Sequence, residues 1–298
     1  MVTPEQIPPQ EQAYPGRTER MEPRPRDSME DYRGRDLLAG RRALITGGDS
    51  GIGRAVAVAF AKEGADVAIA YLDEHEDAEH TAELVRRVGR RCVLLPGDLA
   101  DREHCRQVVE RTVAELGGLE VLVNNVAFQQ PVSSPEELDD EQWLRTFDVN
   151  IHSYFRVIRA ALPHLREGAA IINTASVNGL RGNKSLIDYA ATKGAVIALT
   201  YSLAQALVER RIRVNCVAPG PVWTPLIPAT FDEDRVSSFG SQVPMQRAAH
   251  PDEIAPSYVF FAAEQLSSYY TGEVLAPLGG EVTPGCVGAG RGPGSPVR

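Results

Sequence analysis

Tyr189 and Lys193 lie four positions apart, at the start of a predicted helix that continues to Glu209. Residues four apart share one face of a helix, so the phenol and the ammonium group would project in the same direction, one turn apart. A nearby positive charge lowers the pKa of a tyrosine from its usual value of about 10, which would let it exchange protons near neutral pH. The alternative is an ordinary amphipathic helix, on which the tyrosine is half-buried and the lysine extends to solvent.

Ser176 is a third candidate for the same chemistry. It follows the predicted strand 169–174 and precedes Tyr189 by thirteen residues, with Gly179 and Gly182 between them. The two glycines allow the intervening segment to fold back. The hydroxyl groups of Ser176 and Tyr189 can then converge on one oxygen atom of a substrate.

A glycine-rich turn indicates where an anionic ligand would bind. Gly47, Gly51 and Gly53 separate the predicted strand 42–46 from the predicted helix 54–62. Glycines let the pyrophosphate of a dinucleotide approach the backbone, and the free N–H groups at the helix start attract its charge. The spacing differs from G-x-G-x-x-G, and a glycine turn that caps an ordinary helix is the alternative.

The elements that must position these residues alternate along the chain. Apolar runs predict strands at 42–46, 66–71, 92–95, 120–124, 169–174, 213–217 and 273–277, and longer mixed runs predict helices at 54–62, 77–88, 101–116, 140–165, 189–209 and 252–263. This alternation predicts an α/β fold with a doubly wound, Rossmann-like parallel sheet of about seven strands. The irregular segment 225–246 is expected to cover the substrate or to be a plain surface insertion.

Three polar residues near the predicted crevice leave alternatives open. Asp98 follows the third strand, where it can face the ligand or cap the next helix, a role for which Asp101 is a rival. Asn124 can cross-link neighbouring strand ends or touch a ribose. Asn150 is an amide in an otherwise apolar helix, so it disturbs the hydrogen-bond ladder and serves a function, or it is a core residue satisfied by backbone.

Composition excludes several classes of partner. The chain has 298 residues, of which 43% are hydrophobic, and its formal net charge of -9 argues against general binding to nucleic acids or anionic membranes. No apolar run approaches the roughly 20 residues of a membrane span, no signal peptide is recognisable, and a cytoplasmic location is expected. The four cysteines lack metal-ligand spacing, so they are expected to be reduced and mostly buried, with no metal site.

The two ends of the chain differ in composition from the domain between them. Residues 1–38 are rich in Pro, Gln, Glu and Arg and are expected to be disordered, or to lie across their own domain or a neighbouring subunit. Residues 39–281 are expected to form a single Rossmann-fold domain. Residues 282–298, rich in Gly and Pro, are expected to be a flexible tail.

Six motifs together resemble, in order and spacing, those of the short-chain dehydrogenase/reductase family over about residues 40 to 280. They are Thr46-Gly-Gly-Asp-Ser-Gly-Ile-Gly53, Asn124-Asn125, Asn150, Ser176, Tyr189-x-x-x-Lys193 and Pro219-Gly220. The proline-rich start, the Gly-Gly-Asp-Ser-Gly run and the segment Pro219–Pro228 further resemble a bacterial subgroup described as glucose/ribitol-dehydrogenase-like or general-stress oxidoreductases.

The resemblance implies NAD(P)-dependent hydride transfer between an alcohol, sugar or polyol and the corresponding aldehyde or ketone. It implies that Tyr189 is the general acid/base and that Ser176 hydrogen-bonds the reacting oxygen. Lys193 would bind the nicotinamide ribose and lower the pKa of the tyrosine, and Asn150 would hold a water that relays protons to it. The residues implied to contact the cofactor are Gly47, Asp49, Ser50, Gly51, Ile52, Gly53, Tyr71, Asp98, Leu99, Asn124, Tyr189, Lys193, Pro219, Gly220, Val222 and Thr224.

The family resemblance also implies an assembly. A homotetramer is expected, with one interface built from the helix that carries Tyr189 and the long helix 140–165, and with the arm 1–38 helping to hold subunits together. A protein that binds a dinucleotide without turnover, as a sensor or scaffold, is the alternative function.

Two runs depart from the family pattern. The usual Asn-Asn-Ala-Gly becomes Asn-Asn-Val-Ala, and Val126 narrows the space beside the cofactor. Near the end, residues 276–280 read Ala-Pro-Leu-Gly-Gly in place of a more usual Val-Asp/Asn-Gly-Gly, so that edge is expected to differ locally.

The choice between NAD and NADP is not resolved by the sequence. An acid at the end of the second strand would bind the 2′-hydroxyl of NAD, but this position is Tyr71, followed by Leu72, Asp73 and Glu74. Arg54 is a conceivable partner for a 2′-phosphate, although it is expected to face outward on its helix.

Overall fold

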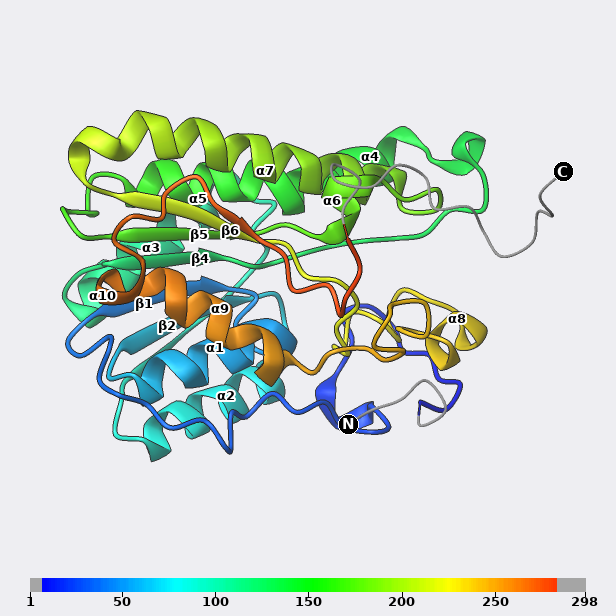
Figure 1. Cartoon of the computed structure of the whole chain (residues 1–298), viewed down its shortest axis with the longest axis horizontal. Helices are drawn as coiled ribbons and strands as arrows, with labels where there is room; N and C mark the ends of the chain where they lie inside the picture. Colours follow the sequence, from blue (N-terminus) through cyan, green and yellow to red (C-terminus); the bar gives the residue numbers. More distant parts are fainter. Residues whose placement is uncertain (1–6, 283–298) are drawn as a thin grey trace, which may run out of the picture.

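Seven parallel strands form the centre of the molecule and lie between two layers of helices (Figure 1). The computed structural model describes residues 7–282, so Cys286 and nearly all of the predicted tail lie outside the described residues. The strands are β1 (Arg42–Thr46), β2 (Asp66–Tyr71), β3 (Cys92–Pro96), β4 (Val121–Asn124), β5 (Ala170–Thr174), β6 (Arg213–Val217) and β7 (Val274–Leu275). They run in the order β3-β2-β1-β4-β5-β6-β7, and every neighbouring pair is parallel.

Helices cover both faces of this sheet. They are α1 (Gly51–Lys62), α2 (His75–Arg87), α3 (Arg102–Leu116), α4 (Asp140–Phe147), α5 (Ser153–Ala161), α6 (Val177–Arg181), α7 (Ile187–Leu207), α8 (Glu233–Ser237), α9 (Pro251–Ala262) and α10 (Glu264–Ser267). On one face α1 packs against α2 and α9, and on the other α3 packs against α5 while α7 covers β6. This arrangement confirms the predicted doubly wound, Rossmann-like fold.

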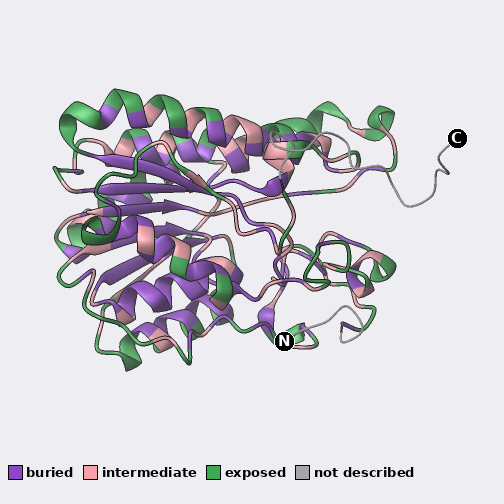
Figure 2. Cartoon of the chain, viewed as in Figure 1, coloured by how far each residue is buried: buried purple, intermediate pink, exposed green. Residues whose placement is uncertain are grey.

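The strands are apolar because helices cover them on both faces. Every residue of β5 and of β6 is buried, and Figure 2 shows exposed residues mainly on the outer sides of the helices and in the loops. Cys105 and Cys216 are buried free thiols, and Cys92 is partly buried. β7 is shorter than the predicted run 273–277, because Pro277 has no N–H group to continue the ladder.

The predicted helix 140–165 is divided by a π-helical turn. The turn spans Asp148–His152, between α4 and α5, and contains Asn150. Turns of this kind insert an extra residue into a helix and often lie at functional sites. Asn150, which was expected to disturb the helical hydrogen bonds, therefore lies in the turn where the α-helical hydrogen-bond pattern is replaced by a π-helical one.

The helix that carries Tyr189 and Lys193 is more apolar than expected. The segment Ile187–Arg210 is long and apolar enough, by length and composition, to cross a membrane. The expectation that no apolar run approaches this length was therefore wrong. In the structure α7 packs on β5, β6 and α6, and it buries both Tyr189 and Lys193. Packing against the sheet accounts for an apolar composition in such a helix.

Residues 7–38, called the arm from here on, lie against the domain. The arm contains one short 3-10 helix, Thr18–Arg20, and it buries Ile7, Met21, Met29 and Leu38. It follows the side of α1 and α2 and reaches the carboxyl ends of the strands (Figure 1). Its described part thus covers its own domain, and a contact with a neighbouring subunit stays a prediction.

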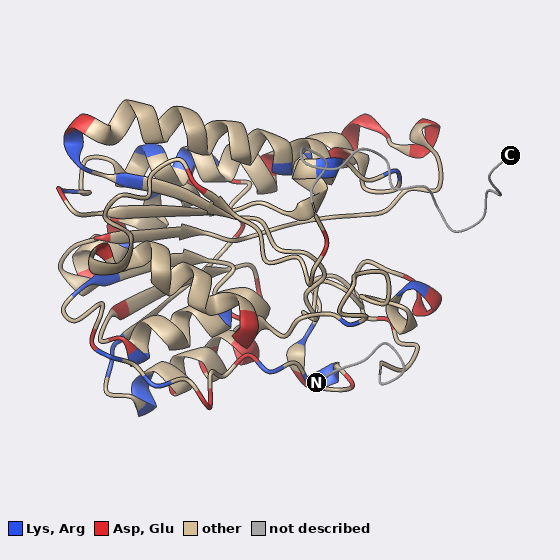
Figure 3. Ribbon diagram, in the orientation of Figure 1, with Lys and Arg blue, Asp and Glu red and all other residues tan. Residues whose placement is uncertain are grey.

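Acidic and basic residues are interspersed on the outer elements, whereas the strands are nearly free of them (Figure 3). Arg54 in α1 is an exception, since it is only 1% exposed. Its guanidinium group pairs with Asp27 of the arm at 3.0 Å and with Asp77 of α2, and its Nε donates to the carbonyl oxygen of Asp49 at 3.0 Å. The expectation that Arg54 faces outward was wrong, because these two carboxylates compensate its buried charge.

Candidate active site

A cavity of about 500 Å³ lies at the carboxyl ends of the strands. Residues that follow β1, β4, β5 and β6 all contribute to its wall, among them Gly47, Asn125, Ser176 and Pro219. Parallel α/β sheets bind ligands at this edge, because the loops after the strands converge there. The cavity is therefore the place to look for the predicted site residues.

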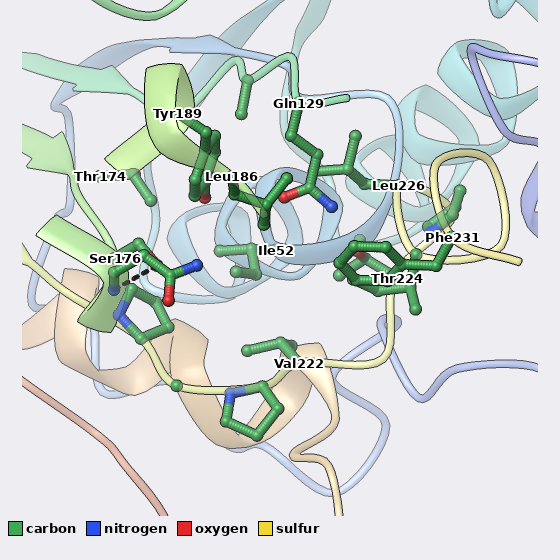
Figure 4. Close-up of a pocket in the computed structure, with 18 of the residues that line it drawn as sticks. Ile52, Gln129, Thr174, Ser176, Leu186, Tyr189, Val222, Thr224, Leu226 and Phe231 are labelled. Atoms are coloured by element: carbon green, nitrogen blue, oxygen red, sulfur yellow. Dashed lines mark hydrogen bonds between the residues drawn. The ribbon is translucent and has the colours of Figure 1, made fainter. Parts of the chain in front are cut away.

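Ser176, Tyr189 and Lys193 all line this cavity, and Figure 4 shows Ser176 and Tyr189 in its wall. Ser176 lies just past β5 and begins α6, and Tyr189 lies in the first turn of α7. The hydroxyl of Ser176 accepts from the backbone N–H of Asn178 at 3.2 Å, which orients the serine at the start of α6. All three side chains are less than 10% exposed. The structure thus brings together the three residues that the sequence singled out.

Burial controls the protonation of both ionisable groups. Desolvation raises the pKa of Tyr189 to about 12, although a hydrogen bond with Ser176 acts in the opposite direction. Desolvation likewise lowers the pKa of Lys193 to about 7, because burial disfavours its charged form. The Nζ atom of Lys193 donates to the carbonyl oxygen of Thr174 at 2.8 Å. Burial is thus the largest influence on the pKa of Tyr189, and Lys193 is not among the groups that lower it.

Asn150 lies beside this group without lining the cavity. Its Oδ1 accepts from the backbone N–H of Phe128 at 2.7 Å, and its Nδ2 donates to the carbonyl oxygen of Phe128 at 2.8 Å. A third contact reaches the hydroxyl of Thr192, the residue before Lys193, at 3.2 Å. The amide thus ties the loop after β4 to α7, which is the backbone-satisfied alternative raised by the sequence.

The glycine turn after β1 leaves the start of α1 open toward the cavity. Gly47 and Gly51 have φ values of +63° and +51°, which glycine adopts without strain. A Cβ atom on Gly53 would lie 1.7 Å from the carbonyl oxygen of Gly47, so the turn closes tightly. The N-cap residue Ser50 makes no side-chain capping hydrogen bond. The first N–H groups of α1 are therefore available to an anion, which fits the pyrophosphate of a dinucleotide.

Most of the predicted cofactor-contacting residues line this cavity. They are Gly47, Asp49, Ser50, Gly51, Ile52, Tyr71, Tyr189, Lys193, Pro219, Gly220, Val222 and Thr224. Gly53 acts through the packing of the turn, as described above. Three others, Asp98, Leu99 and Asn124, are held elsewhere.

Asp98 and Leu99 take structural positions. The carboxylate of Asp98 accepts from the backbone N–H of Ala100 at 2.8 Å and pairs with Arg145 of α4 at 2.7 Å. Leu99 is 3% exposed and packs in the core between the sheet and α3. Asp101 caps α3 instead, since its side chain accepts from the N–H of Glu103 at 2.7 Å. Asp98 and Leu99, which the family resemblance implied would contact the cofactor, are not among the residues that line the cavity.

Asn124 cross-links two strands instead of reaching the cavity. It is 0% exposed, and its Nδ2 donates to Oδ1 of Asn173 in β5 at 2.9 Å. The next residue, Asn125, lines the cavity, and its Nδ2 donates to the carbonyl oxygen of Gly47 at 3.0 Å. The sequence contained a signal for this difference, because β4 ends at Asn124 and Asn125 is the first residue outside the sheet.

Further cavity residues were not predicted singly. Leu72 and Glu74 extend the wall beyond β2, and Leu226 and Phe231 face the catalytic group from the predicted covering segment 225–246 (Figure 4). The arm contributes Tyr14, Pro15 and Gly16. No local sequence pattern indicates that residues so far from the glycine turn in the chain lie beside it.

Comparisons with known proteins agree with this geometry. A family model described as enoyl-(acyl carrier protein) reductase matches residues 47–280. The chain is 53% identical over 278 residues to General stress protein 39 of Bacillus subtilis, with 93% of this chain and 97% of that protein covered. It is 48% identical over 287 residues to a glucose and ribitol dehydrogenase of Daucus carota, with 94% and 98% covered.

A solved structure shares the fold. The short-chain dehydrogenase of Burkholderia cenocepacia in complex with NADP superposes with a TM-score of 0.77 and 34% sequence identity, over 82% of this chain and 98% of that one. The family model and the relatives agree with the site, in which a serine, a tyrosine and a lysine line one cavity. The chain belongs to the short-chain dehydrogenase/reductase family, in its glucose/ribitol-dehydrogenase-like subgroup, and is an NAD(P)-dependent oxidoreductase.

Proposed function

We propose that the chain interconverts an aldehyde or ketone and the corresponding alcohol, sugar or polyol. The observation that carries this proposal is that Ser176, Tyr189 and Lys193 face the same cavity as the uncapped start of α1. The name of the carrot relative, a glucose and ribitol dehydrogenase, supports a hydroxylated substrate. Leu186, Leu226 and Phe231 supply an apolar wall against which the carbon skeleton would pack (Figure 4).

We assign the proton transfer to Tyr189. The nicotinamide, when bound, supplies or accepts the hydride. In reduction the phenol donates its proton to the oxygen on which negative charge develops, and the raised pKa of Tyr189 keeps that proton available. Ser176 donates a hydrogen bond to the same oxygen, where the charge appears. In oxidation the phenol must first lose its proton, so a positive charge on Lys193 matters most in that direction.

We assign Lys193 to the nicotinamide ribose. Its Nζ donates to the carbonyl oxygen of Thr174, which fixes the ammonium group at the floor of the cavity. Hydroxyl oxygens of a ribose would supply further acceptors for its N–H groups and would favour the charged form. Asn150 would hold the relay water beside it, and the π-helical turn around Asn150 supports that role.

The cofactor residues divide into two groups along the cavity. The glycine turn Gly47–Gly53 would hold the pyrophosphate, and Pro219, Gly220, Val222 and Thr224 would contact the nicotinamide amide. Tyr71 and Glu74 lie at the end of the cavity that would take the adenosine ribose. The bound NADP of the Burkholderia enzyme and the two acids Asp49 and Glu74 point to different cofactors, so NAD and NADP both remain in the proposal.

The test is a screen of aldehydes, ketones, sugars and polyols with NADH, NADPH and their oxidised forms. Turnover is followed at the absorbance band of the reduced nicotinamide. Turnover with at least one class, abolished in Tyr189→Phe, is the expected result. Tight cofactor binding without turnover on any compound would instead favour the alternative of a silent dinucleotide-binding or scaffold protein.

We further propose a cytoplasmic homotetramer that binds neither nucleic acid nor membrane, with an arm at 1–38, a catalytic domain at 39–281 and a tail at 282–298. Support for the assembly comes from large apolar side chains left exposed on the two helices expected at the interface. They are Trp143, Leu144 and Phe155 on α4 and α5, and Tyr201 on α7 with Val208 just after it. Such a surface is typical of a protein interface.

A further inference from the structure

The arm crosses the entrance of the cavity. Tyr14, Pro15 and Gly16 line it together with Asp49 of the glycine turn and Glu74 beyond β2. The ring of Tyr14 stands edge-on to that of Phe128 in the loop after β4, with 5.2 Å between ring centres. The outer wall of the predicted adenosine end is therefore made by residues that precede the catalytic domain in the chain.

The arm also holds the segment that would contact the nicotinamide. The indole N–H of Trp223, a fully buried side chain between Val222 and Thr224, donates to the carbonyl oxygen of Pro23 at 2.7 Å. The backbone N–H of Gln12 donates to the carbonyl oxygen of Pro228 at 2.7 Å. These contacts fix the segment 219–231 from its outer side.

Apolar packing joins the same two segments. Ile7 and Met21 of the arm belong to one buried cluster with Trp223, Phe231 and Tyr189. The general acid/base and the segment 219–231 thus share a core with the arm. Such a cluster transmits a displacement of the arm to the cavity, because interiors are close-packed.

A second anchor reaches the glycine turn. Asp27 of the arm is 5% exposed and pairs with Arg54 at 3.0 Å, and Nε of Arg54 donates to the carbonyl oxygen of Asp49 inside the turn. The hydroxyl of Thr81 donates to the same oxygen at 2.7 Å. The arm therefore braces both walls of the cavity, one at Asp49 and the other at Trp223.

We propose that the arm is a part of the cofactor-binding site, in which Tyr14–Gly16 cover the adenosine end of a bound NAD(P)(H) and Pro23 and Asp27 position the two loops that grip it. The inference rests on the proposed function, because it takes the cavity to be the dinucleotide site. Loss of these contacts weakens cofactor binding more than it slows the chemical step at saturating cofactor. Pro23 and Asp27 are positioning residues, since they act through Trp223 and Arg54.

Two glycines of the arm provide a matched test. A Cβ atom on Gly16 would lie 2.2 Å from the carbonyl oxygen of Pro225, so Gly16→Ala pushes the arm away from the cavity. A Cβ atom on Gly34 would lie 1.8 Å from the carbonyl oxygen of Lys62, at the opposite end of α1 from the glycine turn. Gly34→Ala therefore imposes a similar clash on the arm away from the cavity.

The measurement is the dissociation constant of NADH and of NADPH, by nicotinamide fluorescence, at a temperature well below the melting temperature of every variant. For the cofactor that wild type binds, we expect Gly16→Ala to raise the dissociation constant by about fivefold or more. Gly34→Ala should raise the same dissociation constant by less than about twofold. In Gly16→Ala the dissociation constant changes more than kcat at saturating cofactor, whereas Gly34→Ala keeps kcat within about twofold of wild type. Equal effects of the two variants, or an unchanged dissociation constant in Gly16→Ala, overturn the inference.

A second pair keeps the test decisive where Gly16→Ala does not fold. Asp27→Asn removes the charge that holds Arg54, and Glu22→Gln makes the same change at an exposed position of the arm. Only Asp27→Asn is expected to weaken cofactor binding. If wild type binds neither NADH nor NADPH, the proposed function fails and the inference falls with it, whereas normal binding by Asp27→Asn overturns the inference alone.

Discussion

The ammonium group of Lys193 lies 5.5 Å from the centre of the Tyr189 ring, over its face. It donates to the carbonyl oxygen of Thr174, and Lys193 is not among the groups that shift the pKa of Tyr189. The helix therefore places Tyr189 and Lys193 close together, but the ammonium group makes no hydrogen bond with the phenol oxygen. A cofactor ribose between them is what would couple the two groups electrostatically.

Tyr189→Phe should abolish turnover and leave the fold intact. The phenylalanine ring keeps the packing of Tyr189 in its buried cluster, but it has no proton to transfer, so kcat should fall by about 10²–10⁴. Steady-state kinetics on the best carbonyl substrate measures this loss, and cofactor affinity should stay the same. Tyr269→Phe, at a side chain that is 98% exposed, is the control and should retain full activity. Equal activity of the two variants contradicts the assignment.

Lys193→Met should stabilise the protein at neutral and lower pH. Burial depresses the pKa of Lys193 from 10.5 to about 7. Between these two pH values the unfolded chain binds a proton that the folded chain does not bind, so the free energy of unfolding decreases as pH falls from 10.5 to 7. At pH 6 the variant should therefore gain about 1–3 kcal/mol, and the gain should shrink toward pH 10. Melting temperatures across this range measure it. Lys184→Met, at an exposed position, should show no such trend.

Acid should loosen the arm through His250. Burial lowers the pKa of His250 to about 4, and its Nδ1 accepts from the backbone N–H of Arg26 at 3.1 Å, which requires the neutral ring. The unfolded histidine binds a proton near its usual pKa of about 6.5, so stability is lost as pH falls from there through 4. His250→Asn should make the melting temperature less dependent on pH between about 6.5 and 4. His152→Asn, at an exposed position, should leave this pH dependence unchanged. Hydrogen exchange of residues 24–30 at pH 5 reports the arm directly.

Arg54→Met should be among the most destabilising substitutions in the chain. It leaves the buried carboxylates of Asp27 and Asp77 without their counter-ion, which typically costs about 3–5 kcal/mol. Chemical denaturation measures the loss. Arg111→Met breaks an exposed pair with Glu115 and should change stability by less than about 1 kcal/mol. A small effect of Arg54→Met would show that the arm contact at Asp27 contributes little.

Leu144→Glu should break the proposed tetramer. Leu144 is 58% exposed on α4, next to Trp143, on the face where Phe155 is also exposed. A charge in an apolar interface opposes its formation, so the mass in light scattering should fall below that of a tetramer. Val88→Glu, at a position 39% exposed after α2, should leave the mass unchanged. An unaltered mass in both variants argues against this interface.

The fold and the catalytic group were predictable because their signals are local. Strand and helix periodicity, glycine turns and the four-residue spacing of Tyr189 and Lys193 are all written within short windows. Asn150 could also be singled out from the sequence, since an amide in an apolar helix needs a hydrogen-bond partner. The partner, the backbone of Phe128, could not be named, because side-chain contacts between distant segments leave no periodicity.

The features that the sequence did not reveal share one physical cause. Arg54 was predicted to lie at the surface because its ion-pair partner Asp27 belongs to a distant segment whose composition suggested disorder. Asn124 and Asp98 were expected at the cofactor from their positions after two strands. Their contacts with Asn173 and Arg145 follow no local pattern, and their roles toward a cofactor stay predictions. The sequence offered the arm's position across its own domain only as one alternative, because that position depends on contacts such as those of Pro23 with Trp223 and of Asp27 with Arg54.

The bond from the Trp223 indole to the carbonyl oxygen of Pro23 joins residues that are 200 positions apart. During synthesis the arm leaves the ribosome first, and the segment that it anchors follows only after about three-quarters of the chain has been made. Contacts of such long sequence separation form late, because closing the loop between them costs entropy before it is repaid. The wall of the cavity that contains Trp223 is therefore expected to fold later than the glycine turn near the start of the domain.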